Sequence, residues 1–149
     1  MQTLTFPSEL GSITITETNG AITGLDFTSK KKGDEASPLL RKCAAEITEY
    51  LAGKRDVFSV PLHITGTPFD HAVLAAMQKI GFGKTVSYAE LAKKIGKPKA
   101  YRAVANACGR NRMPILIPCH RVVSTHGLGG FSAGVHRKKK LLRIEQSPA

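Results

Sequence analysis

Hydrophobic and polar residues alternate along two stretches near the start of the chain. Residues 12–16 alternate at every position, and residues 21–27 do so less regularly after an Asn19-Gly20 pair. Alternation is typical of a strand with one buried face, and Asn-Gly favours a tight hairpin turn. We therefore predict a β-hairpin here, and a further strand over residues 57–64.

Between these strands the apolar spacing changes to that of a helix. Ser37 is a preferred N-cap, Pro38 suits the first helical position, and Gly53 ends the pattern. The apolar stripe consists of Leu39, Leu40, Cys43, Ala44, Ile47, Tyr50 and Leu51. The first 66 residues therefore predict a small α+β unit.

The second half predicts two helices that each begin with a capping signal. Thr67 lies three residues before Asp70, and Ser87 lies three residues before Glu90. This spacing lets both side chains of a pair bind the N–H groups at the start of a helix. The predicted buried faces are Phe69, Val73, Ala76, Met77 and Ile80 in the first helix and Tyr88, Leu91, Ala92 and Ile95 in the second.

A third helix is predicted over residues 99–108. Its apolar stripe consists of Ala100, Ala103, Val104, Ala107 and Cys108. Because a short turn joins it to the preceding helix, the pair is typical of a helix-turn-helix. Arg102 lies off the stripe, beside Lys99 and Asn106, and is either a solvated arginine or a ligand contact.

An apolar run at residues 114–123 contains a thiol and an imidazole side by side. Pro118 fixes its own φ and so presents Cys119 in a defined direction. Cys119 is either an inert core residue or a nucleophile with His120 as its base. Neighbours on an extended segment point to opposite faces, so we expect either a turn or an intervening water between the two side chains.

The last predicted helix begins near Val135. Glu145 follows Leu141 and Leu142 by one turn, so its carboxylate should face the apolar side and have a partner, unless the helix end frays. The basic run at residues 137–140 is expected to be exposed, as a solvated face or a phosphate contact.

Charge divides the chain into two unequal halves. Residues 1–66 hold seven Lys/Arg and eight Asp/Glu, a net charge of −1, whereas residues 67–149 hold fifteen and three, a net charge of +12. Such a basic half favours a polyanion, with nucleic acid as the leading partner and an anionic membrane surface second. An ordinary solvated surface without a partner is the alternative.

Composition excludes several other classes. No run approaches the ~20 apolar residues of a membrane span, and no signal-peptide pattern opens the chain, so we expect a cytoplasmic protein. The three cysteines, Cys43, Cys108 and Cys119, show no Cys-x-x-Cys pairing. We therefore expect reduced thiols and no zinc site.

A glycine-rich stretch covers residues 127–134. It is either a flexible wing beside the helix-turn-helix or a segment whose backbone approaches a ligand closely, and both readings can hold together. No strand-then-helix context surrounds it, which excludes a dinucleotide fingerprint.

The Pro118-Cys119-His120-Arg121 motif, within its aliphatic run, resembles the active-site signature of the O6-alkylguanine-DNA alkyltransferases. The resemblance implies an α+β protein with a small N-terminal ribonuclease H-like α/β domain, residues 1–66, and a winged helix-turn-helix C-terminal domain, residues 67–149. It also implies irreversible, stoichiometric transfer of an alkyl group from O6-alkylguanine in double-stranded DNA to Cys119. No cofactor or metal is expected, and we expect a monomer.

The resemblance further implies roles for individual residues. Cys119 would be the nucleophile, His120 its base through a bridging water, and Glu145 the group that orients His120. Asn111 would tie the active-site turn together, where an ordinary loop amide is the alternative. Tyr88 would border the guanine pocket, where its alternative is a packed core aromatic.

The remaining implied residues contact DNA or line the pocket. Arg102 would enter the base stack in place of the flipped nucleotide, with Ala103 beside it at the DNA. The implied pocket wall consists of Val122, Ser132 and Gly134. The chain departs from the family where Tyr101 and Asn106 replace small residues.

Three other functions fit parts of the sequence. A non-catalytic winged-helix DNA-binding protein that recognises alkylated bases would share the fold, and a winged-helix transcription factor would need neither thiol nor inward carboxylate. A papain-type hydrolase usually draws its histidine from a distant part of the chain, so the adjacency of Cys119 and His120 disfavours it.

Overall fold

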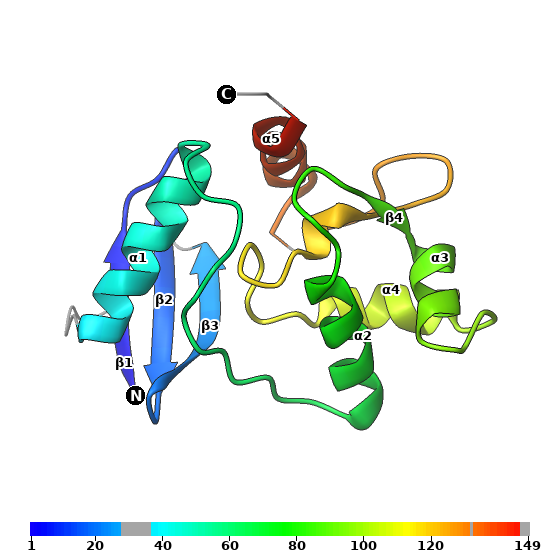
Figure 1. Ribbon diagram of the computed structural model, residues 1–149, viewed down its shortest axis with the longest axis horizontal. Helices are drawn as coiled ribbons and strands as arrows, with labels where there is room; N and C mark the ends of the chain where they lie inside the picture. The colour runs from blue at the N-terminus through cyan, green and yellow to red at the C-terminus, as the bar shows by residue number, and fades with distance from the viewer. Residues whose placement is uncertain (28–36, 132, 147–149) are drawn as a thin grey trace. The chain divides into compact units, whose positions relative to one another are not determined.

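The computed structural model describes residues 1–27, 37–131 and 133–146, which form two compact units (Figure 1). The first unit ends at Ile64 and the second begins at Thr65. This break lies two residues before the boundary that the charge division suggests.

The first unit is a three-stranded antiparallel sheet covered by one helix. Strands β1 (Gln2–Phe6), β2 (Ile13–Thr18) and β3 (Ala21–Phe27) lie in the order β1-β2-β3. Helix α1 (Pro38–Leu51) packs across the sheet (Figure 1). The fully buried side chains here are Ile13, Ile15, Ile22, Leu25, Leu40, Cys43, Ile47 and Tyr50.

Local signals in this unit predict its turn and its helix start correctly. Asn19 has a φ of 51° and Gly20 a φ of 80°, as a two-residue hairpin turn requires. The Ser37 hydroxyl accepts a 3.1 Å hydrogen bond from the N–H of Leu40 and so caps α1. Strand β1 was not predicted.

The predicted strand over residues 57–64 is wrong. The segment is described throughout, and it makes only an isolated bridge between Ile22 and Leu62. The N–H of Ile22 donates to the carbonyl of Pro61, and the carbonyl of Ile22 accepts from the N–H of His63, both at 2.9 Å. Because Pro61 has no N–H to donate, a regular ladder does not extend through this point.

The second unit packs short helices around a small parallel sheet. Helices α2 (Pro68–Gln78), α3 (Tyr88–Lys94) and α4 (Tyr101–Gly109) pack against one another, and α5 (Val135–Gln146) packs on a 3-10 turn, Cys119–Arg121. The fully buried side chains here include Val73, Met77, Leu91, Ala92, Val104, Ile117, Val122 and Leu141.

Both predicted capping boxes are present in this unit. The Thr67 hydroxyl accepts from the N–H of Asp70 at 3.1 Å, and the Asp70 carboxylate accepts from the N–H of Thr67 at 3.2 Å. Ser87 and Glu90 form the equivalent pair at the start of α3, with distances of 3.0 and 3.1 Å. The sequence therefore locates both helix starts.

Helix α4 has a narrower buried face than its sequence suggests. Val104, Ala107 and Cys108 are buried, but Ala103, predicted on the same stripe, is exposed. Successive helical residues lie about 100° apart, so Ala103 turns away from a face centred on Val104 and Ala107.

The parallel sheet brings two distant segments together. Strand β4 (Val86–Ser87) pairs with β5 (Val122–Val123), with Val86 opposite Val122. Because α3 begins directly after β4, and β5 directly follows the 3-10 turn, Tyr88 is carried toward the segment that holds Cys119.

Candidate active site

Cys119 begins the 3-10 turn that directly follows Pro118. Its N–H donates to the carbonyl of Ile117 at 2.7 Å, and the N–H of Arg121 donates to the carbonyl of Pro118 at 3.0 Å. The structure therefore has a turn at this point, one of the two arrangements expected from the adjacency of Cys119 and His120.

Asn111 holds the loop that precedes this turn. Its side-chain N–H donates to the carbonyl of Ile117 at 3.0 Å, and its side-chain oxygen accepts from the N–H of Met113 at 3.0 Å. Within the loop, Ile115 has a φ of 76°, which is unusual for a β-branched residue. The buried amide thus joins both ends of a loop that adopts an unfavourable backbone conformation.

The carboxylate of Glu145 lies behind the turn and has several partners. Its Oε2 lies 2.6 Å from Nε2 of His120, and Nε and Nη2 of Arg121 donate to its two oxygens at 2.8 and 3.0 Å. The N–H of Gly83 donates to its Oε1 at 3.1 Å. The predicted inward carboxylate is therefore present and paired.

Burial sets the protonation state of His120, and the Glu145 contact sets its tautomer. Burial is the largest influence and lowers the pKa of the imidazole, although the hydrogen bond and charge of Glu145 oppose it. The ring is therefore neutral near pH 7. Since a carboxylate accepts at Nε2, we assign the ring proton to Nε2, which leaves Nδ1 as the basic nitrogen.

Cys119 is a protonated thiol at rest. Burial raises its pKa to about 11, against an Asn111 hydrogen bond and the charge of Lys138, which lower it. Because only the thiolate is a strong nucleophile, reaction at this sulfur requires that its proton be removed as the reaction proceeds.

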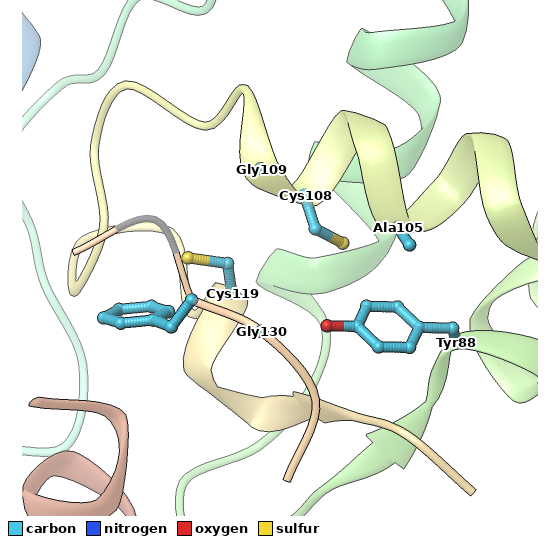
Figure 2. A pocket seen from close by; sticks show the side chains of 7 residues that line it. Tyr88, Ala105, Cys108, Gly109, Cys119 and Gly130 are labelled. Carbon is cyan, nitrogen blue, oxygen red and sulfur yellow. The ribbon is translucent and has the colours of Figure 1, made fainter. Parts of the chain in front are cut away.

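A cavity of about 290 Å³ lies beside this thiol (Figure 2). In Figure 2 the Tyr88 hydroxyl points toward the side of the cavity that holds Cys108 and Cys119, and the backbone at Gly130 borders the same cavity. The cavity is lined by Tyr88, Ala105, Cys108, Gly109, Cys119, Gly130 and Phe131. Its lining is mostly apolar, and Tyr88 contributes a hydroxyl to it.

The glycine-rich segment approaches Tyr88 closely. Gly129 has a φ of +75°, and a Cβ built on it would lie 2.9 Å from the Tyr88 hydroxyl oxygen. Burial raises the pKa of Tyr88, and a backbone hydrogen bond with Gly130 acts in the opposite direction. The hydroxyl therefore stays protonated and able to donate, beside a wall that only glycine can form.

Two family models match the chain on either side of residue 65. One, described as "6-O-methylguanine DNA methyltransferase, ribonuclease-like domain", matches residues 2–64, and "6-O-methylguanine DNA methyltransferase, DNA binding domain" matches residues 68–147. The chain belongs to the 6-O-methylguanine DNA methyltransferase family. The ribonuclease-like first unit and the DNA-binding second unit confirm the predicted fold class, whereas the wing stays a prediction.

Two curated relatives match most of the length of this chain. The methylated-DNA--protein-cysteine methyltransferase of Methanosarcina barkeri is 36% identical over 94% of each chain. The constitutive methylated-DNA--protein-cysteine methyltransferase of Bacillus subtilis is 36% identical and covers 95% of this chain and 93% of its own. Both units are therefore common to this chain and to these methyltransferases.

Solved structures show the same fold. Mycobacterium tuberculosis OGT in complex with DNA has a TM-score of 0.90 and 34% identity, and the match covers 100% of this chain and 96% of that one. Schizosaccharomyces pombe Atl1, solved with damaged DNA containing O6-carboxymethylguanine, has a TM-score of 0.50 and 30% identity over 57% of this chain and 82% of its own.

The predicted methyltransferase site residues divide into two groups. Cys119, His120, Glu145, Asn111 and Tyr88 come together around the turn and the cavity. The remaining predicted residues are Val122, Gly134, Arg102, Ala103 and Ser132, and the first four are absent from the described lining of the cavity.

Each residue of the second group has its own place. Val122 is fully buried, Gly134 lies just before α5, and Arg102 and Ala103 are exposed on α4. Ser132 lies outside the described residues.

The structure adds cavity residues that the sequence did not indicate. Ala105, Cys108 and Gly109 line the cavity. Arg121 forms an ion pair with Glu145, which gives this arginine a structural role. Lys138 is fully buried, so the expectation that the whole run 137–140 is exposed is wrong. The signal was available for Lys138, because it lies three, four and seven residues before Leu141, Leu142 and Glu145 on one helix face.

Within the described ranges, no group of three or more His, Cys, Asp or Glu side chains is arranged to hold a metal ion. No helix among those residues is both long and apolar enough to cross a membrane.

Proposed function

We propose that this protein repairs DNA by moving an alkyl group from O6 of guanine to the sulfur of Cys119. The observation that carries the proposal is the arrangement of Cys119 at a cavity, directly before His120, whose ring is held by Glu145. This arrangement lies in the part of the chain that matches the DNA-binding domain of the methyltransferase family.

The first step is loss of the thiol proton. Nδ1 of His120 accepts it through a bridging water, while the Glu145 carboxylate, held in place by Arg121, stabilises the imidazolium that forms. The resting thiol, whose pKa burial raises to about 11, is thus activated only when a base is in place. This limits reaction with adventitious electrophiles.

Alkyl transfer then follows an in-line displacement. The Cys119 thiolate attacks the alkyl carbon, a C–S bond forms, and the bond between that carbon and O6 breaks. The guanine leaves as an anion that Tyr88 stabilises by donating a hydrogen bond or proton. The thioether formed at Cys119 is not hydrolysed by water at neutral pH, so the thiol is not regenerated. Each protein molecule therefore reacts once.

Double-stranded DNA that carries O6-alkylguanine is the proposed substrate. The net charge of +12 in residues 67–149 and the exposed Arg102 on α4 support phosphate contact and entry into the base stack. The related structures solved with DNA support the same partner. A base must leave the stack to reach a buried thiol, so Arg102 would fill the space of the flipped nucleotide.

We further propose that the protein acts as a cytoplasmic monomer without a cofactor. Cys43, Cys108 and Cys119 are free thiols, which suits a reducing compartment. The proposed reaction needs only the thiol, the base and the alkylated guanine.

A lesion-binding protein without chemistry is the second candidate. The similarity to Atl1 favours it only in part, because that match covers 57% of this chain. Cys119 is a nucleophile, and His120, which is held by Glu145, is a base. A protein that only binds the lesion needs neither group.

Mass spectrometry after incubation with a methylated-guanine duplex separates the two functions. We expect one added methyl group on the peptide that contains Cys119, and none on the Cys108 peptide. The Cys119→Ser variant should bind the duplex without gaining mass, and Cys108→Ser should still be methylated. Tight binding by the unmodified chain with no mass gain would leave the binding function.

A further inference from the structure

Lys138 is the one fully buried lysine in the described part of the chain. Its ammonium donates to the carbonyl of Val122 at 2.7 Å and to the carbonyl of Gly130 at 3.0 Å. It also lies 6.0 Å from the centre of the Tyr88 ring. A lysine is rarely placed in such a position unless its charge or its donors are needed there.

The two carbonyls belong to segments that enclose the cavity. Val122 directly follows the turn that carries Cys119, and Gly130 lines the cavity. Lys138 therefore joins the segment of the nucleophile to the glycine-rich wall. Glycines give that wall little rigidity of their own, so a tie near its middle fixes its place.

Helix α5 carries both supports of the site on one face. Glu145 lies two turns after Lys138 and holds His120, while Lys138 holds the wall that faces the thiol. The helix thereby links the position of the base to the shape of the cavity.

The charge of Lys138 acts on the groups around it. Its positive charge lowers the pKa of the Cys119 and Cys108 thiols, and it also opposes protonation of His120. Burial lowers the pKa of Lys138 itself, against the two thiols that raise it. The remaining charged groups that face the turn, Glu145 and Arg121, form an ion pair with each other.

We propose that Lys138 is a positioning residue for alkyl transfer, which fixes the wall at Gly130 against the Cys119 turn and supplies positive charge beside the sulfur. This role rests on the proposed function, because it concerns the same reaction. It is distinct from the roles of His120 and Glu145, since Lys138 neither removes nor receives the thiol proton.

Substitutions at position 138 test the role, with a neighbour as control. Lys138→Met removes the N–H donors and the positive charge. Lys138→Gln keeps an amide group that can donate but has no charge, and Lys138→Arg keeps the charge. Lys139→Met changes the adjacent exposed lysine of α5. Each rate is measured with free O6-alkylguanine base, which needs no phosphate contact, and is expressed per folded molecule from a melting curve.

The expected rates fall in a fixed order. The transfer rate should fall by about 100-fold or more in Lys138→Met, by less in Lys138→Gln, and by the least in Lys138→Arg. The rate of Lys139→Met should stay within about twofold of the wild-type rate. The proposal would be overturned if Lys138→Met and Lys139→Met had equal rates. It would also be overturned if the three Lys138 variants reached the wild-type rate once each rate is expressed per folded molecule.

The reactivity of the thiol gives a second readout that a purely structural role would not change. The Cys119 peptide is labelled with iodoacetamide across a pH series in the folded variants. The midpoint should move to higher pH in Lys138→Met and Lys138→Gln but not in Lys138→Arg, and an unmoved midpoint in all three overturns the charge contribution. If the wild-type chain transfers no alkyl group, the proposed function is wrong. The shift in the labelling midpoint still tests whether the charge of Lys138 acts on the Cys119 thiol.

Discussion

Nε2 of His120 lies 2.6 Å from Oε2 of Glu145, and both side chains are buried. Arg121 binds the same carboxylate through two nitrogens, so the negative charge of Glu145 is shared between a cation and an imidazole. The carboxylate therefore orients the ring without forcing it to be protonated at rest. This arrangement suits a base that must accept a proton and hold it briefly.

Glu145→Gln should slow alkyl transfer by about 10²–10⁴-fold, because the amide can bind Nε2 through its oxygen but cannot stabilise the imidazolium as a charge does. The variant should also lose stability, by about 3–5 kcal/mol, since Arg121 is left as a buried charge without its ion pair. Single-turnover kinetics and urea unfolding measure the two effects. Glu49→Gln, an exposed glutamate of the first unit, is the control. A transfer rate equal to that of Glu49→Gln would contradict the role of Glu145.

The transfer rate should fall on the acid side of neutrality. Since burial lowers the pKa of His120 below its ordinary 6.5, the ring stays neutral until the pH drops beneath that value, and then it can no longer accept the thiol proton. The unfolded chain binds this proton at higher pH than the folded chain does. The free energy of unfolding should therefore also decrease as pH falls from about 6.5 through the folded pKa.

Single-turnover rates and melting temperatures between about pH 5 and pH 8 check this pH dependence. The control is His126→Asn, which changes an exposed histidine and should leave the shape of both curves intact. A rate that does not fall at any acid pH at which the protein stays folded would mean that His120 is not the base.

Gly129→Ala should damage the cavity. The new methyl group would lie 2.9 Å from the Tyr88 hydroxyl oxygen on a backbone with a φ of +75°, so both the wall and the ring must move. We expect a loss of about 1–3 kcal/mol in unfolding free energy and slower transfer from free base and from DNA. Gly127→Ala is a matched control, because a Cβ there meets nothing within 4 Å. Equal behaviour of the two variants would exclude a tight wall at Gly129.

Arg102→Ala should slow repair of duplex DNA by roughly 10- to 100-fold, which corresponds to about 1–3 kcal/mol of lost stabilisation of the flipped state. Reaction with free O6-alkylguanine should be unchanged, since Arg102 is exposed on α4 and does not line the cavity. Parallel rate measurements on both substrates test this, with Arg41→Ala in α1 as a control for loss of a surface charge. Equal losses on both substrates would remove the role of Arg102 in base flipping.

The parts of the fold that the sequence predicts well are those controlled by local chemistry. The capping boxes at Thr67 and Ser87 and the turn at Asn19-Gly20 depend on residues within three positions of one another. Strand pairing at residues 57–64 depends on a distant partner and on Pro61, and there the prediction fails.

The site shows the same division. The inward direction of Glu145 follows from its spacing to Leu141 and Leu142, and the structure confirms it. The same spacing applies to Lys138, but a lysine within a basic run is normally solvated. The basic run therefore leads to the wrong prediction that Lys138 is exposed. The hydrogen bond from Gly83 to Glu145 spans 62 positions, and no periodicity in the sequence indicates it.

The two hydrogen bonds of Asn111 have a consequence for the ageing of the protein. Hydrolysis of the side-chain amide would place a carboxylate oxygen where an N–H now faces the carbonyl of Ile117, and two acceptors would then be in contact. It would also add a negative charge near Cys119, which disfavours the thiolate. A chain that has lost this one amide group should therefore be visible as an acidic band on isoelectric focusing that no longer accepts an alkyl group.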